Sequence, residues 1–231
     1  MNLCVIPARG GSERIARKNI KEFNGKPMIA WSIEAALASE CFDQIIVSTD
    51  DDAIAEIAEG QGAAVPFRRP AELSDNYVGT TAVVSHAVNW YTEHCWEPQA
   101  VCCLYPTAPF VRPKDIKDGL KILRSKKVEF AFSVTSFAFP IQRAIRVTDD
   151  QRVEMFQPAF SNTRSQDLEE AWHDAGQFYW GRARAWSQNK PIFSNESAPV
   201  VLPRYRVLDI DTIDDWEQAE VIFDVLKARY E

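Results

Sequence analysis

LCVIPARGGSERIARKN, residues 3–19, is the most informative stretch of this chain. It opens with a short apolar run, Leu3–Ile6, which is typical of a buried strand, and continues into a polar loop with two adjacent glycines. Glycine lets the backbone approach a ligand closely, and its N–H group can point at phosphate oxygens. The ten residues from Arg9 to Lys18 also carry four cations. The stretch therefore predicts a strand that leads into a triphosphate-binding loop.

Two common nucleotide-binding motifs do not match this loop. Residues 10–17 lack the G-x-x-x-x-G-K-[ST] spacing, and no G-x-G-x-x-G follows the first strand. These absences disfavour a P-loop ATPase and a dinucleotide-dependent oxidoreductase. The remaining structural alternative is a solvated surface turn whose arginines only improve solubility.

The rest of the chain alternates short apolar runs with amphipathic stretches, which is the βα order of an α/β fold. All-apolar runs suit a mostly parallel sheet with helices on both faces. The predicted strands are Leu3–Ile6, Gln44–Ser48, Val65–Arg68, Ala100–Leu104, Phe130–Val134, Gln177–Trp180, Pro199–Leu202 and Arg206–Ile210. The predicted helices are Met28–Ala38, Ala53–Ala58, Thr80–Glu93, Lys114–Ser125, Arg182–Gln188 and Ile213–Tyr230.

The βα rhythm breaks between about residues 137 and 190. There Ala144–Val147 and Val153–Phe156 flank a turn, and a polar stretch follows. This pattern predicts a hairpin-containing insertion rather than a second core. Because single cores divide only beyond roughly 250 to 300 residues, we expect one domain over residues 1–231.

Composition limits the partners of the protein. Hydrophobic residues make up 46% and charged residues 26% of the chain, as in ordinary globular proteins. The net charge of −7 argues against a nucleic-acid partner and against binding to an anionic membrane. No run approaches the roughly 18 apolar residues that a membrane span needs. We therefore expect a cytoplasmic protein that meets anionic ligands only locally.

Two aspartates, Asp209 and Asp211, end the last predicted strand. Successive side chains of a strand alternate between its faces, so these two carboxylates are expected on the same side. Mg²⁺ prefers oxygen ligands, commonly one or two carboxylates together with substrate phosphates. The acidic start of a helix explains Thr212, Asp214 and Asp215, but it does not explain the preceding pair. Asp209 and Asp211 are therefore predicted to bind Mg²⁺.

Five short motifs carry a resemblance to a known family. They are Ile6-Pro7-Ala8-Arg9-Gly10-Gly11-Ser12 with Lys18-Asn19, Ile46-Val47-Ser48-Thr49-Asp50, Arg69-Pro70-Ala71-Glu72-Leu73, Pro106-Thr107-Ala108-Pro109 and Asp209-Ile210-Asp211-Thr212. Together they resemble the sialic-acid-type cytidylyltransferases, the CMP-N-acylneuraminate synthetase family, over nearly the whole chain. The resemblance implies a Rossmann-like nucleotidyltransferase fold. It also implies a homodimer in which the insertion of one subunit reaches the active site of the other.

The resemblance also implies roles for individual residues. The implied catalytic residues are Arg9, Lys18 and Asp211. The implied nucleotide-binding residues are Ala8, Arg9, Gly10, Gly11, Ser12, Lys18, Asn19, Arg69 and Thr80. Many relatives carry Gln at the position of Tyr105, where that Gln faces the sugar. The departure leaves the nucleotide site intact and leaves the choice of acidic sugar open.

The sugar end is expected around the segment His173–Gly181, which resembles the pseudaminic acid cytidylyltransferase branch of the family. We interpret its first residues as a polar loop before an aromatic strand; the alternative is an ordinary turn at Gly176 beside core aromatics. Arg143 and Arg164 could pair with a sugar carboxylate, or they could be ordinary surface arginines. The candidate substrate-binding residues are Tyr105, Thr107, Arg143, Arg164, His173, Asp174 and Gln177.

These observations support one functional hypothesis. The protein would transfer CMP from CTP to a nine-carbon acidic sugar, pseudaminic acid, with release of pyrophosphate. The same reaction on N-acetylneuraminic, legionaminic or a Kdo-like acid is the nearest alternative. A non-catalytic nucleotide-binding module is the alternative of a different class, and it predicts loss of the chemical residues. Arg9, Lys18, Asp209 and Asp211 are all present, which disfavours that module.

Overall fold

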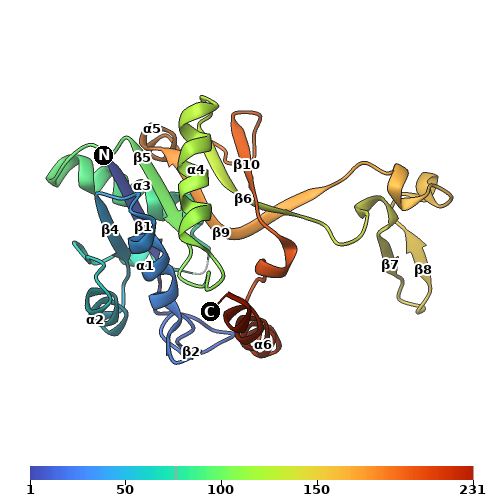
Figure 1. Ribbon diagram of the computed structural model, residues 1–231, viewed down its shortest axis with the longest axis horizontal. Helices are drawn as coiled ribbons and strands as arrows, with labels where there is room; N and C mark the ends of the chain where they lie inside the picture. Colours follow the sequence, from blue (N-terminus) through green and yellow to red (C-terminus); the bar gives the residue numbers. More distant parts are fainter. Residues whose placement is uncertain (76, 231) are drawn as a thin grey trace.

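A six-stranded sheet in the order β10-β6-β9-β5-β1-β4 forms the centre of the molecule (Figure 1). The computed structural model describes residues 1–75 and 77–230. The strands of this sheet are β1 (Asn2–Pro7), β4 (Gln44–Ser48), β5 (Ala100–Leu104), β6 (Phe130–Ser136), β9 (Trp172–Arg182) and β10 (Ser197–Val201). β9 runs antiparallel to β5 and β6, and the other neighbouring pairs are parallel. The predicted mostly parallel α/β sheet is thereby confirmed.

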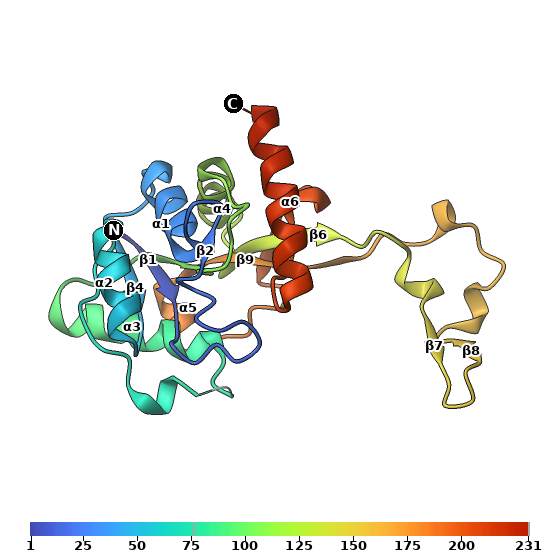
Figure 2. The ribbon, with the colours of Figure 1, turned by 90° about the horizontal axis from the view of Figure 1, so that it is seen from below.

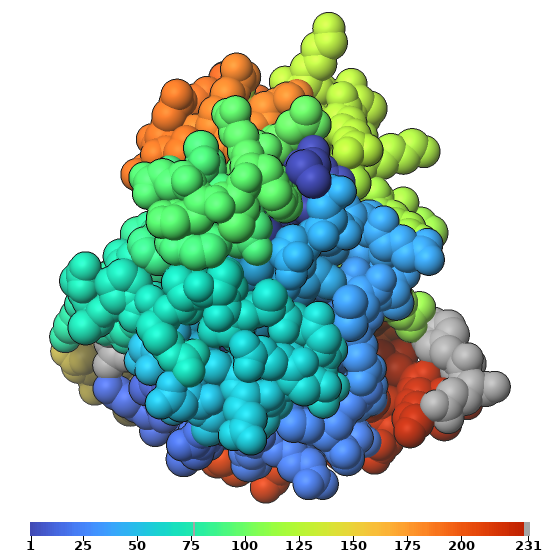
Figure 3. Space-filling view, turned by 90° about the vertical axis from the view of Figure 1, so that its left-hand side faces the viewer, coloured from blue at the N-terminus to red at the C-terminus, as the bar shows by residue number. Residues whose placement is uncertain are grey.

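Helices cover both faces of the sheet. They are α1 (Met28–Ser39), α2 (Asp52–Gly60), α3 (Thr80–His94), α4 (Pro113–Ser125), α5 (Ala183–Ser187) and α6 (Ile213–Tyr230). In β1, Cys4 and Ile6 pack with residues of α1, α2 and α4, whereas Leu3 and Val5 pack with residues of α3 and α5. This alternation follows from the two-residue period of a strand and explains the unbroken apolar run. Seen from the side opposite β10, the first hundred residues form most of the surface (Figure 3).

Helix α6 brings the end of the chain beside its beginning. Trp216 of α6 packs edge-on against Phe23, with 5.4 Å between the ring centroids, and Ile210 joins the same buried cluster. The short strands β2 (Glu22–Phe23) and β3 (Lys26–Pro27) form a hairpin in this region. Thr212 and Asp215 exchange backbone-to-side-chain hydrogen bonds of 2.7 and 3.2 Å, which is a capping box at the start of the helix. Residues near both chain ends can therefore meet at one site.

Residues 137–171 extend away from the body as an arm (Figures 1 and 2). The arm carries the antiparallel hairpin of β7 (Ile145–Val147) and β8 (Val153–Met155). Short 3₁₀ turns occur at Ala71–Leu73, Ile141–Arg143, Pro158–Phe160, Ser165–Asp167 and Arg204–Arg206. The predicted hairpin is present, but residues 172–190 belong to β9, α5 and the turn after α5, not to the arm.

Two predicted strands are absent from the described residues. The segment Val65–Arg68 contributes only one isolated bridge, between Arg68 and Thr49, and its Pro66 has no N–H group for a ladder. The segment Arg206–Ile210 follows a 3₁₀ turn, and the buried Arg206 guanidinium pairs with Asp115 of α4 at 2.5 and 3.0 Å. That ion pair holds the segment beside α4 instead of at the sheet edge. Within the described ranges, no helix is both long and apolar enough to cross a membrane.

Candidate active site

A cleft of about 550 Å³ opens where β1, β4 and β5 end. These three strands are parallel, so their carboxyl ends share one edge of the sheet, which is where ligands bind in open α/β folds. The residues around the cleft are Pro7, Arg9, Ser12, Glu13, Arg14, Ile15, Lys18, Asn19, Arg69, Leu73, Asp75, Val78, Thr80, Val83, Tyr105, Pro106, Thr107 and Asp211. Residues from the start, the middle and the end of the chain are brought together there.

The loop after β1 is tied to the end of β4. The backbone N–H of Ala8 donates to the Ser48 carbonyl at 3.0 Å, and that of Gly10 donates to Asp50 Oδ1 at 2.9 Å. A Cβ atom on Gly10 would lie 2.9 Å from an Asp51 oxygen, so a larger residue would push this loop outward. Gly11 is exposed, and a Cβ atom there would meet nothing within 4 Å. The Gly10 N–H is therefore already hydrogen-bonded, whereas Arg9, Arg14 and Lys18 line the cleft.

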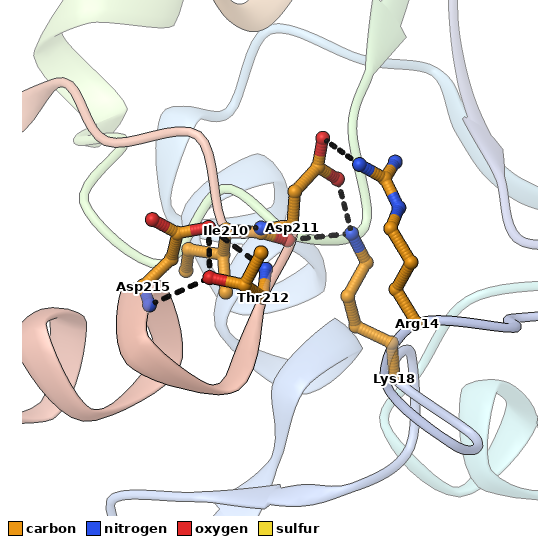
Figure 4. A network of polar contacts seen from close by, with 6 residues as sticks. All are labelled: Arg14, Lys18, Ile210, Asp211, Thr212 and Asp215. Atoms are coloured by element: carbon orange, nitrogen blue, oxygen red, sulfur yellow. Dashed lines mark hydrogen bonds and ion pairs between the residues drawn. The ribbon is translucent and has the colours of Figure 1, made fainter.

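The cations of this loop meet a carboxylate from the other end of the chain (Figure 4). Lys18 Nζ donates to the Ile210 carbonyl at 2.6 Å and to Asp211 Oδ1 at 3.2 Å. Arg14 reaches the second oxygen of Asp211 at 2.8 Å. The Asn19 amide donates to the Arg9 carbonyl at 2.9 Å and braces the loop from within. One acidic group is thus matched by two cations, and a net positive charge faces the cleft.

Asp209 and Asp211 interact electrostatically. Partial desolvation of the Asp209 carboxyl, followed by the negative charge of Asp211, raises the pKa of Asp209 above its usual value. No group of three or more His, Cys, Asp or Glu side chains with metal-site geometry occurs within residues 1–75 and 77–230. The candidate ligands are thus the carboxylates of Asp209 and Asp211 alone. Mg²⁺ commonly uses one or two carboxylates together with phosphate oxygens.

Two further guanidinium groups, of Arg69 and Arg9, face the cleft. Arg69 is buried, and its guanidinium donates to the hydroxyl of Ser48 at 3.1 Å and also to the Ser48 carbonyl. Burial lowers the pKa of Arg69 to about 10, so it keeps its positive charge at neutral pH. Arg9 donates to the Asp75 carbonyl at 2.9 Å. Both guanidinium groups line the cleft.

The predicted site residues divide into two groups. Those brought together around the cleft are Arg9, Ser12, Lys18, Asn19, Arg69, Thr80, Tyr105, Thr107 and Asp211. Those outside its lining are Ala8, Gly10, Gly11, Arg143, Arg164, His173, Asp174, Gln177 and Asp209. Ala8 and Gly10 belong to the loop itself and act through its backbone.

The segment expected as a polar loop at the sugar end is part of strand β9. His173 stacks at an angle on Phe137, with ring centroids 4.7 Å apart. Gln177 is buried, and its amide donates to the Arg206 carbonyl, so that side chain faces the interior instead of a substrate. Gly176 has a φ of 60°, and the pairing register shifts there against Phe132 and Val134 of β6. Neither the expected loop nor the alternative turn at Gly176 is present there, because Gly176 forms a β-bulge inside the strand.

The two arginines expected to pair with a sugar carboxylate lie in the arm. Arg143 donates to Ser165 Oγ at 3.3 Å, and Arg164 pairs with Asp167 at 2.7 Å. Both side chains are exposed. Within one subunit they are not part of the cleft, so any contact with a substrate would require the arm to lie against another subunit.

Comparison with known proteins identifies the family. The family model described as Cytidylyltransferase matches residues 3–224. The chain belongs to the cytidylyltransferase family. The pseudaminic acid cytidylyltransferase of Campylobacter jejuni serotype O:2 is 46% identical over 224 residues, which are 97% of each chain. More distant relatives include the N-acylneuraminate cytidylyltransferase of Escherichia coli O18:K1:H7, 30% identical over 95% of this chain and 51% of that protein.

Two solved structures share the fold of this cytidylyltransferase. A CMP-2-keto-3-deoxy-manno-octonic acid synthetase in complex with CTP superimposes with a TM-score of 0.69 over 96% of this chain and 98% of that chain, at 19% identity. The 4-diphosphocytidyl-2C-methyl-D-erythritol synthase of Anaerococcus prevotii gives a TM-score of 0.64 at 13% identity, with the same coverage. At these identities the likeness concerns the fold, which is that of a nucleotidyltransferase.

The sequence does not predict the contacts that three residues make in or beside the cytidylyltransferase cleft. Arg14 lies in the basic loop, but its pairing with Asp211 depends on the path of the chain before α6. Asp75 holds Arg9 through a backbone carbonyl, which no side-chain pattern reveals. Tyr179 contacts Tyr105 only through the folded sheet, with ring centroids 5.4 Å apart. Each of these contacts joins elements that are distant in sequence.

Proposed function

We propose that this cytidylyltransferase transfers CMP from CTP to pseudaminic acid, a nine-carbon acidic sugar, and releases pyrophosphate. The observation that carries the proposal is the meeting of the Arg14 and Lys18 cations with Asp211, at 2.8 and 3.2 Å, at the mouth of a polar cleft. Full-length relatives at 46% identity that bear this activity in their names support the choice of sugar.

The proposed reaction is a single displacement at phosphorus. The anomeric hydroxyl oxygen of the sugar forms a bond to the α-phosphorus of CTP, the bond to the bridging β-phosphate oxygen breaks, and the hydroxyl proton is released to a base. Arg9, Arg14 and Lys18 would neutralise charge on the triphosphate and on the departing pyrophosphate. Ser12 and Asn19 line the same side of the cleft and would orient the phosphates.

The proposal includes a magnesium ion, held by carboxylates at the edge of this site. Asp209 and Asp211 are close enough for the charge of one to raise the pKa of the other, and a bound dication would remove that repulsion. We assign Mg²⁺ to this pair. When bound, the ion would supply positive charge to the phosphate oxygens. Displacement of Arg14 and Lys18 from Asp211 by a triphosphate would free that carboxylate for the ion.

We also propose a homodimer formed through the arm. Several apolar side chains of the arm are largely exposed in the single chain, including Phe139 at 83%, Val153 at 66% and Phe156 at 62%. Exposed apolar patches of this kind usually mark interfaces. We place the protein in the cytoplasm, where CTP is available.

Pyrophosphate release tests the proposed reaction. The purified protein would be incubated with Mg²⁺, CTP and one sugar at a time from a panel of pseudaminic, legionaminic, N-acetylneuraminic and Kdo acids. We expect turnover with CTP to be highest on pseudaminic acid and to be lost when ATP or GTP replaces CTP. Higher turnover with another acid would show that this acid, and not pseudaminic acid, is the preferred substrate. Absence of turnover on every acid would refute the proposed reaction.

A further inference from the structure

A second cavity, of about 650 Å³, lies between α1, α6 and the loop that precedes α4. Trp31 of α1, residues 109–112 of the loop, and Phe223 and Leu226 of α6 belong to its lining. Among the residues that the structure describes, the linings of this cavity and of the active-site cleft share no member. The cavity has the size of a small-molecule site, and the proposed reaction gives it no role.

The lining of this second cavity is basic and apolar, although the chain as a whole carries a net charge of −7. Of its ten described residues, six are apolar and none is acidic. The other four are the cationic residues Lys26, Arg112, Arg206 and Lys227. Cations gathered around a cavity with apolar walls raise the local concentration of anions. The composition of the lining therefore favours a negatively charged ligand.

Arg206 gives the cavity a fixed positive charge. Only 7% of its side chain is exposed, and its two terminal nitrogens donate to the Asp115 carboxylate at 2.5 and 3.0 Å. The Nε–H group of Arg206 has no hydrogen-bond partner among the described residues. A buried donor without a partner is costly, so an oxygen of a ligand or of a bridging water that meets this group would lower the free energy.

Aromatic rings form the apolar side of the cavity. The ring centroids of Trp31 and Phe223 lie 4.4 Å apart, and those of Phe110 and Phe223 lie 6.0 Å apart. Lys26, which pairs with Glu34, places its ammonium group 3.5 Å from the Trp31 ring centroid. A ring of a ligand can bury apolar area against these side chains. A nucleoside triphosphate matches this side poorly, because charged phosphate oxygens make up much of its surface.

We propose that this second cavity binds a small amphipathic anion, namely an apolar ring that carries one acidic group. The ring would pack on the aromatic side chains of Trp31 and Phe223, and the acidic group would face the cations of Arg206 and Lys227. Both halves of the ligand are needed, because a neutral ring leaves the cations without a counterion and a bare inorganic anion leaves the apolar side exposed to water. The inference goes beyond the proposed function, since no residue of this cavity takes part in the transfer of CMP.

A pair of fluorescent probes tests this ligand class. One is 8-anilinonaphthalene-1-sulfonate, and the other is N-phenyl-1-naphthylamine, which has the same rings without the sulfonate group. We expect saturable binding of the sulfonate probe by the wild-type protein, at least about tenfold tighter than binding of the uncharged probe. The sulfonate probe should also stay bound at saturating CTP and Mg²⁺. Equal affinities would overturn the requirement for an anion, and displacement by CTP would place the probe in the active-site cleft.

Two variants locate the bound probe. Lys227→Glu reverses one charge of the lining, and Leu226→Gln removes part of its apolar side, so each should raise the Kd of the sulfonate probe by roughly threefold or more. The matched controls lie outside the lining of either cavity and should keep the wild-type Kd: Lys126→Glu, at an exposed lysine after α4, and Val221→Gln, at an exposed valine of α6.

An unfolded variant cannot imitate the expected result, because loosened apolar surface increases the fluorescence of the sulfonate probe. A wild-type Kd in both Lys227→Glu and Leu226→Gln would show that the probe binds elsewhere, for example on the arm, and would overturn the proposal. Should Leu226→Gln not fold, Lys227→Glu alone decides, since Lys227 is exposed.

Discussion

Lys18 marks the point where the two ends of the chain meet. Its ammonium group is largely buried, with 19% of the side chain exposed, and it binds both the Ile210 carbonyl and Asp211. Charge-assisted hydrogen bonds in a partly desolvated place are stronger than those on the surface. Lys18 therefore joins the loop after β1 to the segment before α6, and it also lines the cleft.

At the same scale, Arg9→Ala should lower kcat/KM by at least about a hundredfold, because a preorganised cation at a reacting phosphate is worth several kcal/mol. Pyrophosphate release from CTP measures the effect. The matched control is Arg17→Gln, which removes a cation of the same loop that pairs with Asp51 and lies outside the cleft lining. Near-normal turnover of Arg9→Ala would refute the role given to Arg9.

The sequence predicts these residues unequally. The loop from Arg9 to Asn19 is contiguous, so its glycines and cations indicate a phosphate site from the sequence alone. The contacts of Thr80 with Tyr105, at 3.1 Å, and of Tyr179 with Asp174, at 2.5 Å, form only once the sheet and its bulge are folded. No local pattern contains that information. The sequence predicts Asp174 as a substrate contact at the sugar end, whereas the fold gives its oxygens to Tyr179 and Gly176.

Among the elements, α4 packs on the sheet through a glycine. A Cβ atom on Gly119 would lie 2.6 Å from the Trp180 ring and 3.0 Å from that of Phe178. Gly119→Ala should therefore lower the free energy of unfolding by about 1 to 3 kcal/mol, although alanine favours helices. Gly60→Ala, at the end of α2 with open space around its Cβ atom, is the control and should be neutral or stabilising. Urea unfolding compares them, and a stable Gly119→Ala would contradict the close packing.

A second element contact, between α5 and the start of β6, should depend on pH. Burial disfavours the ionised Glu129, but Arg184 at 2.8 Å and Lys190 at 3.5 Å outweigh it and lower its pKa. The resulting stability is present above the unfolded-state pKa of about 4.3 and is lost as the pH falls through the lower folded value. Glu129→Gln should cost about 1 kcal/mol at pH 7, a modest effect because Arg184 is largely exposed.

Thermal unfolding at several pH values checks this prediction. The Tm of Glu129→Gln should lie below that of the wild type at pH 7, and the two should converge as the pH falls below the lowered folded pKa of Glu129. A difference that is constant with pH would show that packing, and not charge, is responsible.

Element boundaries can be predicted where apolar runs are bounded by turn residues. Gln44–Ser48 and Ala100–Leu104 agree with the structure at both ends. Arg206–Ile210 does not, because a buried ion pair with Asp115 decides its path and the partner lies far away in sequence. The sequence also places the start of β9 too late, because the bulge at Gly176 resembles a turn.

On the scale of the whole molecule, the arm exposes large apolar side chains, such as Phe139 and Phe156, and a single chain does not explain that exposure. It extends from the body without covering any helix or strand of it (Figure 2). The sequence indicates a hairpin insertion there, but not how far it reaches, because its direction is set by β6 and β9 continuing beyond the sheet. A homodimer would cover its apolar side chains.

Replacing Phe139 and Phe156 by Ser should therefore convert the protein from a dimer to a monomer. Light scattering after size-exclusion chromatography measures the mass in solution. Val221→Ser, which changes an exposed apolar residue of α6 with 65% exposure, is the control and should remain dimeric. A wild-type protein that is monomeric at micromolar concentration would contradict the proposed interface.

Calorimetric titration of CTP in the presence of Mg²⁺ tests the central claim most directly, namely that cations from the start of the chain and Asp211 from its end form one triphosphate site. The account predicts saturable binding of CTP by the wild type. It also predicts at least tenfold weaker binding by Lys18→Gln, because that change removes the charge between the loop and Asp211. Undetectable binding by the wild type, or equal affinity of the two proteins, would contradict it.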